Sequence, residues 1–208
     1  MKTNSIKGNI GKSMLGILAI AGVIALSPLT ASAHCDTMGG PTVADGMKAM
    51  ETNNVNYVLK WVQPEYEKEL LQAFTLSMQV RNLSPEAREL SEKYFFDNLV
   101  RIHRTGENTP FTGVKPVGTP VDERVLAADK SIEVGNLSPL KGIIPAERIS
   151  ELTERFEKVM ALKNFDPNNL EAGRAYIEAY VGFFKFAEGE EEHHNLSDAH
   201  GEANEHHQ

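Results

Sequence analysis

The feature that most constrains the fold is an internal repeat with a shift of 82 residues. Residues 48–104 align without a gap on residues 130–186, and 12 of the 57 paired positions are identical. In first-copy numbering the identical residues are Lys48, Glu51, Asn54, Glu65, Glu69, Leu70, Phe74, Met78, Asn82, Pro85, Glu89 and Tyr94. Because the Asn and Pro residues that punctuate helices keep their places, we interpret the chain as a tandem duplication.

Both copies show the spacing of amphipathic helices. Apolar residues recur four positions apart, which places them on one helical face and predicts that they form the core. The residues of these stripes are Leu70, Phe74, Met78, Leu152, Phe156 and Met160. A metal site built from methionine sulfur is the weaker interpretation, since Met is a routine core filler.

The expected helices cover about residues 42–52, 64–82, 85–105, 121–134, 145–164 and 167–188. Thr42 is the expected cap of the first, and Ser84-Pro85 is a strong start signal for the third. No segment alternates as a half-buried strand does. The predicted fold is all-α, a four-helix-bundle-like domain built from two tandem helical-hairpin repeats at about 48–104 and 130–186.

Residues 106–120 separate the copies and contain three Gly and three Pro, which excludes a helix. Loops of this length are uncommon in compact domains unless they are functional or disordered. We favour a connector between the halves over a pocket lid. Phe111 and Val114 are the residues that would attach it to the bundle.

Residues 1–33 have the pattern of a secretory signal peptide. A basic start precedes an apolar run at residues 14–26, and Ala31-Ser32-Ala33 supplies the small residues that the peptidase requires. The run is shorter than the roughly 20 residues of a membrane-spanning helix. We therefore expect cleavage between Ala33 and His34, a periplasmic or extracellular location, and no stable membrane insertion afterwards.

Charge and missing motifs exclude several functions. The leader holds three of the 21 basic residues and no acid, so the mature chain has 18 basic against 29 acidic residues and a net charge of −11. Such a surface repels nucleic acid. The sequence has no phosphate-binding glycine loop, nucleophile elbow or His-Glu-x-x-His pair. No nucleotide or organic cofactor is indicated, and catalytic activity remains open.

Residues 34–41, at the mature amino terminus, form a candidate metal hook. A released His34 would offer an α-amine and an imidazole, and Cys35 a backbone amide and the only thiol of the chain. This set favours copper(II) or nickel(II) when planar and zinc when tetrahedral. Asp36 could contribute weakly, and Gly39-Gly40 lets the segment fold back. Alternatively, Cys35 is a buried thiol or links a homodimer.

The tail, residues 189–208, is expected to be disordered and acidic. Its histidines are His193, His194, His200, His206 and His207. Short His-rich tracts are typical of loose metal binding, while a merely solvated terminus explains the composition equally well. A further candidate ligand is His103, although its place in the last turn before Gly106 favours a structural role at the helix carboxyl end.

His34-Cys35-Asp36 resembles the mature start of nickel superoxide dismutase, a helical-bundle enzyme. The resemblance implies nickel bound by the amine and imidazole of His34 and by the amide and sulfur of Cys35. It covers three residues only. The family's second cysteine and the proline before it correspond to Gly39 and Met38 here.

Over most of the mature chain the sequence resembles an uncharacterised family of exported bacterial helical proteins whose mature chain starts His-Cys-Asp-Thr. The matching stretches are AHCDTMGGP, YVLKWV, SPEARELSEKYFF, VRIHRTGENTPFTGVKPVG and AGRAYIEAYV. The resemblance implies export and a helical fold, and no activity.

These observations favour an exported helical protein that binds copper, nickel or zinc at its amino end, and through its tail, for metal buffering, delivery or simple redox chemistry. The alternatives are a nickel superoxide dismutase-like enzyme and a non-catalytic interaction or structural protein of the cell envelope.

Overall fold

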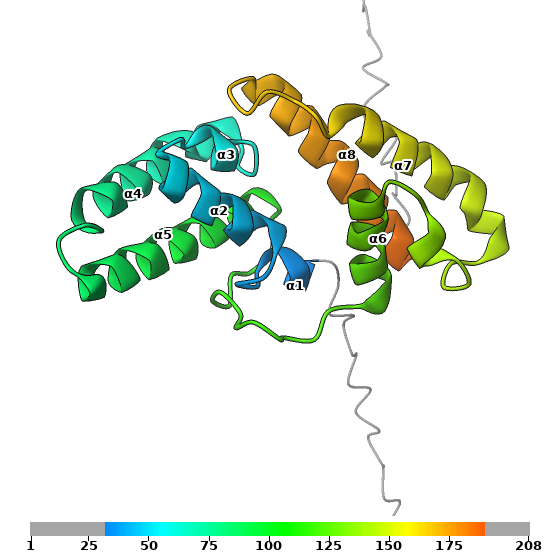
Figure 1. Cartoon of the computed structure of the whole chain (residues 1–208), viewed down its shortest axis with the longest axis horizontal. Helices are drawn as coiled ribbons and strands as arrows, with labels where there is room; N and C mark the ends of the chain where they lie inside the picture. Colours follow the sequence, from blue (N-terminus) through cyan, green and yellow to red (C-terminus); the bar gives the residue numbers. More distant parts are fainter. Residues whose placement is uncertain (1–31, 190–208) are drawn as a thin grey trace, which may run out of the picture.

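The computed structural model describes residues 32–189 (Figure 1). The predicted signal peptide, apart from Ser32 and Ala33, and the five tail histidines lie outside the described residues. Within residues 32–189 the fold is all-helical, as predicted, and the only β-type pairing is an isolated bridge between Thr37 and Lys115. None of the described helices is both long and apolar enough to span a membrane.

The elements follow each other in two similar halves. The first half comprises α1 (Ser32–Cys35), α2 (Pro41–Thr52), α3 (Asn56–Leu59), the 3-10 turn η1 (Pro64–Tyr66), α4 (Glu67–Val80) and α5 (Pro85–Gly106). The second half comprises α6 (Glu123–Val134), η2 (Ser138–Leu140), η3 (Ala146–Arg148), α7 (Ile149–Leu162) and α8 (Leu170–Glu188).

The structure repeats with the same 82-residue shift as the sequence. The bounds of α2, η1 and α4 plus 82 give those of α6, η3 and α7. The matching helices α2 and α6 each end at a residue with positive φ, Asn53 at 51° and Gly135 at 75°. One long-range hydrogen bond is also repeated. Arg81 donates to the Met50 carbonyl, and Lys163 donates to that of Ile132.

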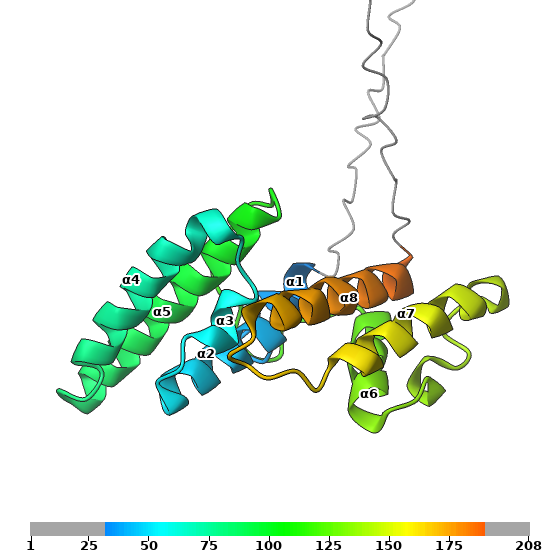
Figure 2. The same cartoon turned by 90° about the horizontal axis from the view of Figure 1, so that it is seen from above.

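Each half has its own core. The helical hairpin α4–α5 packs on α2, and the hairpin α7–α8 packs on α6 (Figures 1 and 2). The predicted stripes lie in these cores: Leu70, Phe74, Leu152 and Phe156 are buried, and the two methionines pack against them. The predicted hairpins are therefore confirmed, and the bundle consists of two small cores side by side.

The two halves meet at a joint, which we define as residues 34–37 and 60–62 with the facing residues of α6 and α8. Trp61 follows α3 in the first half, yet its side chain belongs to the core of the second half. In return, Leu170 of α8 packs against the first core. Arg174 of α8 reaches back to the carboxylate of Glu67. Because each core contains a residue from the other half, the halves depend on each other.

Two predicted helix starts are wrong. Thr42 does not cap α2, because Pro41, which has no N–H to satisfy, is already its first residue and Gly40 is the flanking one. The second wrong start is that of α8, which begins at Leu170 instead of Pro167. The Asn169 side chain caps it by accepting from the Ala172 N–H at 3.1 Å. Pro167 lies in the turn that precedes α8 and not in the helix itself.

Candidate metal centre

The segment that carries the predicted hook, residues 34–37, is buried between the two halves. His34 is 7% exposed, Cys35 3%, Asp36 3% and Thr37 5%. Figure 1 shows α1 between α2 and α6, next to the linker that joins the halves. Burial of four consecutive residues, three of them polar, requires specific partners for their polar groups.

The linker supplies the backbone partners. Lys115 donates its N–H to the Asp36 carbonyl at 2.7 Å and accepts from the Met38 N–H at 2.8 Å. Phe111 and Val114 pack against the first core, as predicted. The Gly/Pro-rich connector is therefore held against the amino-terminal segment and closes it from outside.

A tight turn folds the segment back on itself. Gly40 lies so close to His34 that a β-carbon on Gly40 would stand 2.0 Å from the His34 carbonyl oxygen. The Thr37 hydroxyl donates to the same carbonyl at 3.1 Å. The fold-back expected from Gly39-Gly40 is thus present, and Gly40 is the residue that it requires.

The His34 imidazole is oriented by a carboxylate from the second half. Its Nε2 is hydrogen-bonded to Oδ2 of Asp129 on α6, and Oδ1 of Asp129 accepts from the Tyr180 hydroxyl at 2.6 Å. If Nε2 carries the proton that Asp129 accepts, Nδ1 of a neutral imidazole holds a free lone pair. This Nδ1 is buried and has no hydrogen-bond partner among the described residues. A carboxylate on one ring nitrogen is the usual support of a histidine that binds metal through the other.

The thiol of Cys35 packs in the second core. Burial raises the pKa of this thiol far above its usual range, and the carboxylates of Glu107, Asp36 and Asp129 raise it further. Without a cation beside it the group is therefore a neutral thiol, whereas metal coordination deprotonates thiols outright. A disulfide to a second chain would require the buried segment to open.

Asp36 faces the first half. Its Oδ2 lies 3.2 Å from Nε of Arg104 on α5, which in turn contacts Glu107 at 3.2 Å. Burial nevertheless raises the pKa of the Asp36 carboxyl to about 6, with Arg104 opposing the rise. With His34 bound to α6 and Asp36 to α5, the segment links the two halves.

His103 has a structural environment. Its Nδ1 lies 2.8 Å from the Trp61 carbonyl, to which it must donate, and its ring meets the Trp61 ring edge-on at 5.6 Å. Its Nε2 is buried 3.7 Å from Glu107, beyond hydrogen-bond distance. His103 thus supports the joint from the end of α5, in keeping with the structural interpretation.

Within residues 32–189 no three His, Cys, Asp or Glu side chains are grouped so that they could hold a metal ion. His34 and Cys35 would have to bind it with backbone nitrogens, as the hook hypothesis assumes. Sequence reasoning missed Asp129 and Tyr180. Both depart from the repeat, with Met47 and Asn98 at the corresponding positions, so differences between the copies were the available signal.

A family model described as a family of unknown function (DUF6448) matches residues 39–186. The chain belongs to this family. No curated protein and no solved structure matches it at a significant level. The matched region covers both halves and begins directly after residues 34–38, so it supports the repeated fold and assigns no chemistry to the amino-terminal segment.

Proposed function

We propose that the chain is exported, is cut between Ala33 and His34, and then binds a transition-metal ion through His34 and Cys35. The observation that carries the proposal is the His34 imidazole, which Asp129 holds by Nε2 while Nδ1 is buried without a partner. This geometry is an observation separate from the residue types His and Cys, which suggested the metal hook in the sequence.

Covalent geometry makes Nδ1 the ring nitrogen of His34 that can bind the same metal ion as the α-amine. The α-amine and Nδ1 of one histidine close a six-membered ring around a metal, whereas Nε2 cannot reach the same ion. Cys35 follows with its amide nitrogen and its sulfur, so two residues provide four donors. Ser32 and Ala33 precede His34 within α1, which means that the nitrogen of His34 becomes an amine only after cleavage.

The electrostatics favour a cation at this place. Asp36, Glu107 and Asp129 surround the thiol and oppose its ionisation. A divalent ion would reverse that balance by pairing with the thiolate. Nitrogen donors with one sulfur favour copper(II) or nickel(II) in a planar arrangement. Metal buffering or delivery, or a simple redox step, is the corresponding function, and the tail histidines would provide a second, looser store.

The test is metal analysis of the mature chain, together with its intact mass. We expect a mass that begins at His34 and about one equivalent of copper, nickel or zinc that resists dialysis. The ion should be lost in Cys35→Ser and in the uncut chain, and should be retained when the five tail histidines are replaced by glutamine. A mature chain that stays metal-free after metal challenge would rule out the proposal.

Asp129→Asn tests the orienting role separately. Loss of such a carboxylate typically weakens metal binding about 10- to 100-fold, whereas Asp97→Asn on α5, a carboxylate for which no partner is observed among the described residues, should have no effect. Superoxide consumption that requires both the metal and Cys35 would distinguish a dismutase from a binding protein.

A further inference from the structure

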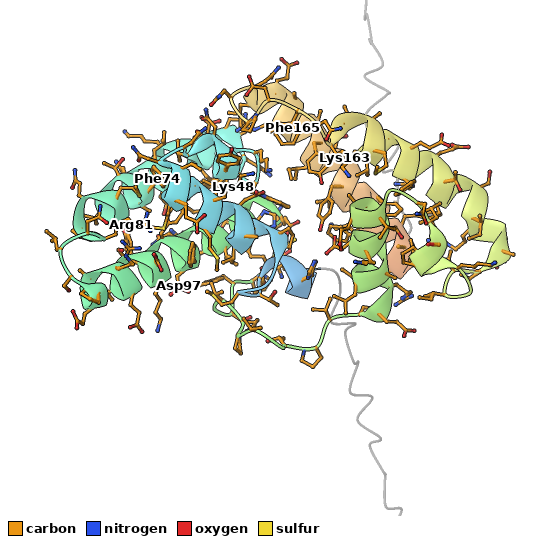
Figure 3. All side chains as sticks on the ribbon, in the orientation of Figure 1. Lys48, Phe74, Arg81, Asp97, Lys163 and Phe165 are labelled. Atoms are coloured by element: carbon orange, nitrogen blue, oxygen red, sulfur yellow. The ribbon has the colours of Figure 1, made fainter. Side chains whose placement is uncertain are left out.

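A second site lies at the joint, next to Tyr180, whose hydroxyl donates to the Asp129 carboxylate. An open cavity of about 370 Å³ is lined by residues of α2, α3 and the segment after it, the α7–α8 connection and α8. Its volume falls within the range of small-molecule sites in proteins. Both halves contribute, as Figure 3 shows for Lys48 on the first half and Lys163 and Phe165 on the second.

Five aromatic rings line this cavity. They are Tyr57, Trp61, Phe165, Tyr176 and Tyr180. Phe165 and Tyr176 have ring centroids 5.3 Å apart, and the Tyr180 ring lies 6.0 Å from both Tyr176 and Trp61. Such walls accept a flat unsaturated group by edge and offset ring contacts. Burial and the carboxylates of Asp45 and Asp129 raise the pKa of Tyr176 to about 12, so its hydroxyl stays neutral at physiological pH.

Three lysines and one carboxylate also line the cavity. Asp45 is already occupied: its Oδ2 lies 2.8 Å from Nζ of Lys60 and accepts from the Trp61 ring N–H at 2.7 Å. Lys48 and Lys163 have no carboxylate partner among the described residues. Lys48 lies over the Tyr57 ring at 4.6 Å, and Lys163 donates to a backbone carbonyl. Two positive charges are therefore unbalanced in a chain whose net charge is −8.

The duplication accounts for only part of this lining. At the corresponding positions of the other copy Asp45, Lys60 and Trp61 become alanine, glycine and isoleucine, and Phe165 and Tyr180 become leucine and asparagine. Lys48 and Tyr176, in contrast, keep their residue types in the other copy, as Lys130 and Tyr94, so the halves differ in part of the lining.

We propose that this cavity binds a small aromatic carboxylate, with the ring against the aromatic wall and the carboxylate at the ammonium groups of Lys48 and Lys163. The charge selects an anion, since three lysines face one carboxylate and a cavity with a net positive charge concentrates anions. The ring walls select a flat ligand over a bare inorganic ion. This proposal does not depend on metal at His34.

Trp61 is the only tryptophan of the chain and forms part of the wall, so its fluorescence reports occupancy directly. The probe is benzoate, titrated into the chelator-treated full-length mature chain, with isothermal titration calorimetry on the same samples. We expect saturable binding of one equivalent. Benzamide, which has the same shape without the charge, should bind at least about tenfold more weakly.

Lys48→Gln is the first variant, because Lys48 is exposed and its side chain makes no hydrogen bond among the described residues. It should weaken benzoate binding about tenfold, and Lys163→Gln should act in the same direction. Lys93→Gln, an exposed lysine on α5 outside the cavity, should leave the affinity unchanged. The proposal is overturned if neither fluorescence nor heat saturates, if benzamide binds as well as benzoate, if inorganic phosphate binds as tightly as benzoate, or if Lys93→Gln has the same effect as Lys48→Gln.

Discussion

Replacing Gly40 by alanine tests whether the amino-terminal turn is closed as described. The added β-carbon would meet the His34 carbonyl oxygen at 2.0 Å and the Thr37 Oγ1 at 3.1 Å. The first distance must grow by about 1.4 Å before it reaches an ordinary contact of 3.4 Å, and a carbonyl cannot rotate away as a side chain does. The backbone of Gly40, at φ −81° and ψ 164°, suits alanine, so the whole cost is steric.

Overpacking of this kind costs about 1–3 kcal/mol, and a contact with backbone lies at the upper end. We expect Gly40→Ala to lower the free energy of unfolding by about 3 kcal/mol, or the melting temperature by roughly 6–12 °C for a domain of this size. Gly39→Ala is the matched control, because its β-carbon would meet nothing within 4 Å. That variant should change stability by no more than about 0.5 kcal/mol.

The assay is urea unfolding of the metal-free mature chain, followed by far-ultraviolet circular dichroism. A Gly40→Ala variant as stable as Gly39→Ala would refute the closed turn. The same pair of variants then serves in metal binding, since a turn forced open would move His34 away from Asp129.

Three further predictions concern buried polar groups. The pKa of Asp36 is about 6 in the folded chain, above its unfolded value of 3.8. Its contribution to the free energy of unfolding should therefore be complete below pH about 4 and should fall by at most about 3 kcal/mol as the pH rises through 6. Urea unfolding of Asp36→Asn at a series of pH values should lack this decline. The thiol of Cys35 should react with iodoacetamide at least about tenfold more slowly in the folded metal-free chain than in urea, because burial raises its pKa and blocks access; equal rates would contradict its burial. Arg81→Leu should cost about 2–3 kcal/mol in urea unfolding by leaving the Met50 carbonyl unpaired, while Lys163→Leu, at the matching and more exposed position, should cost less than about 1 kcal/mol.

Local patterns predicted most of the helical framework. The apolar stripes, the Ser84-Pro85 start and the 82-residue repeat depend on interactions within a few residues or on direct comparison of two copies. The structure confirms them: Ser84 accepts from the Ala87 N–H at 3.1 Å, and the repeat extends to the helix bounds. Where a competing local device existed, the prediction was wrong, as at Pro167, where Asn169 is the actual cap.

The joint could not be derived in the same way. Asp129 meets His34 across 95 residues, and Trp61 enters the core of the other half. Neither pairing produces a periodic pattern in the sequence, because packing between the halves depends on side-chain shape and not on the helix period. The hook residues were identified from their chemistry alone. The carboxylate that orients them was not, because an acidic residue on a helix in an acidic chain is unremarkable by itself.

The burial of residues 34–37 sets an order of events for an exported precursor. A peptidase needs its substrate extended over several residues, yet the bond between Ala33 and His34 lies within the helical turn α1, and His34 is 7% exposed. A precursor that folded first would already hold His34 at Asp129 and the next residues, Asp36 and Met38, at Lys115 of the linker. If the chain is cut between Ala33 and His34 as we propose, cutting comes before folding, and any metal that the new amino terminus acquires would be captured by a chain still closing around it.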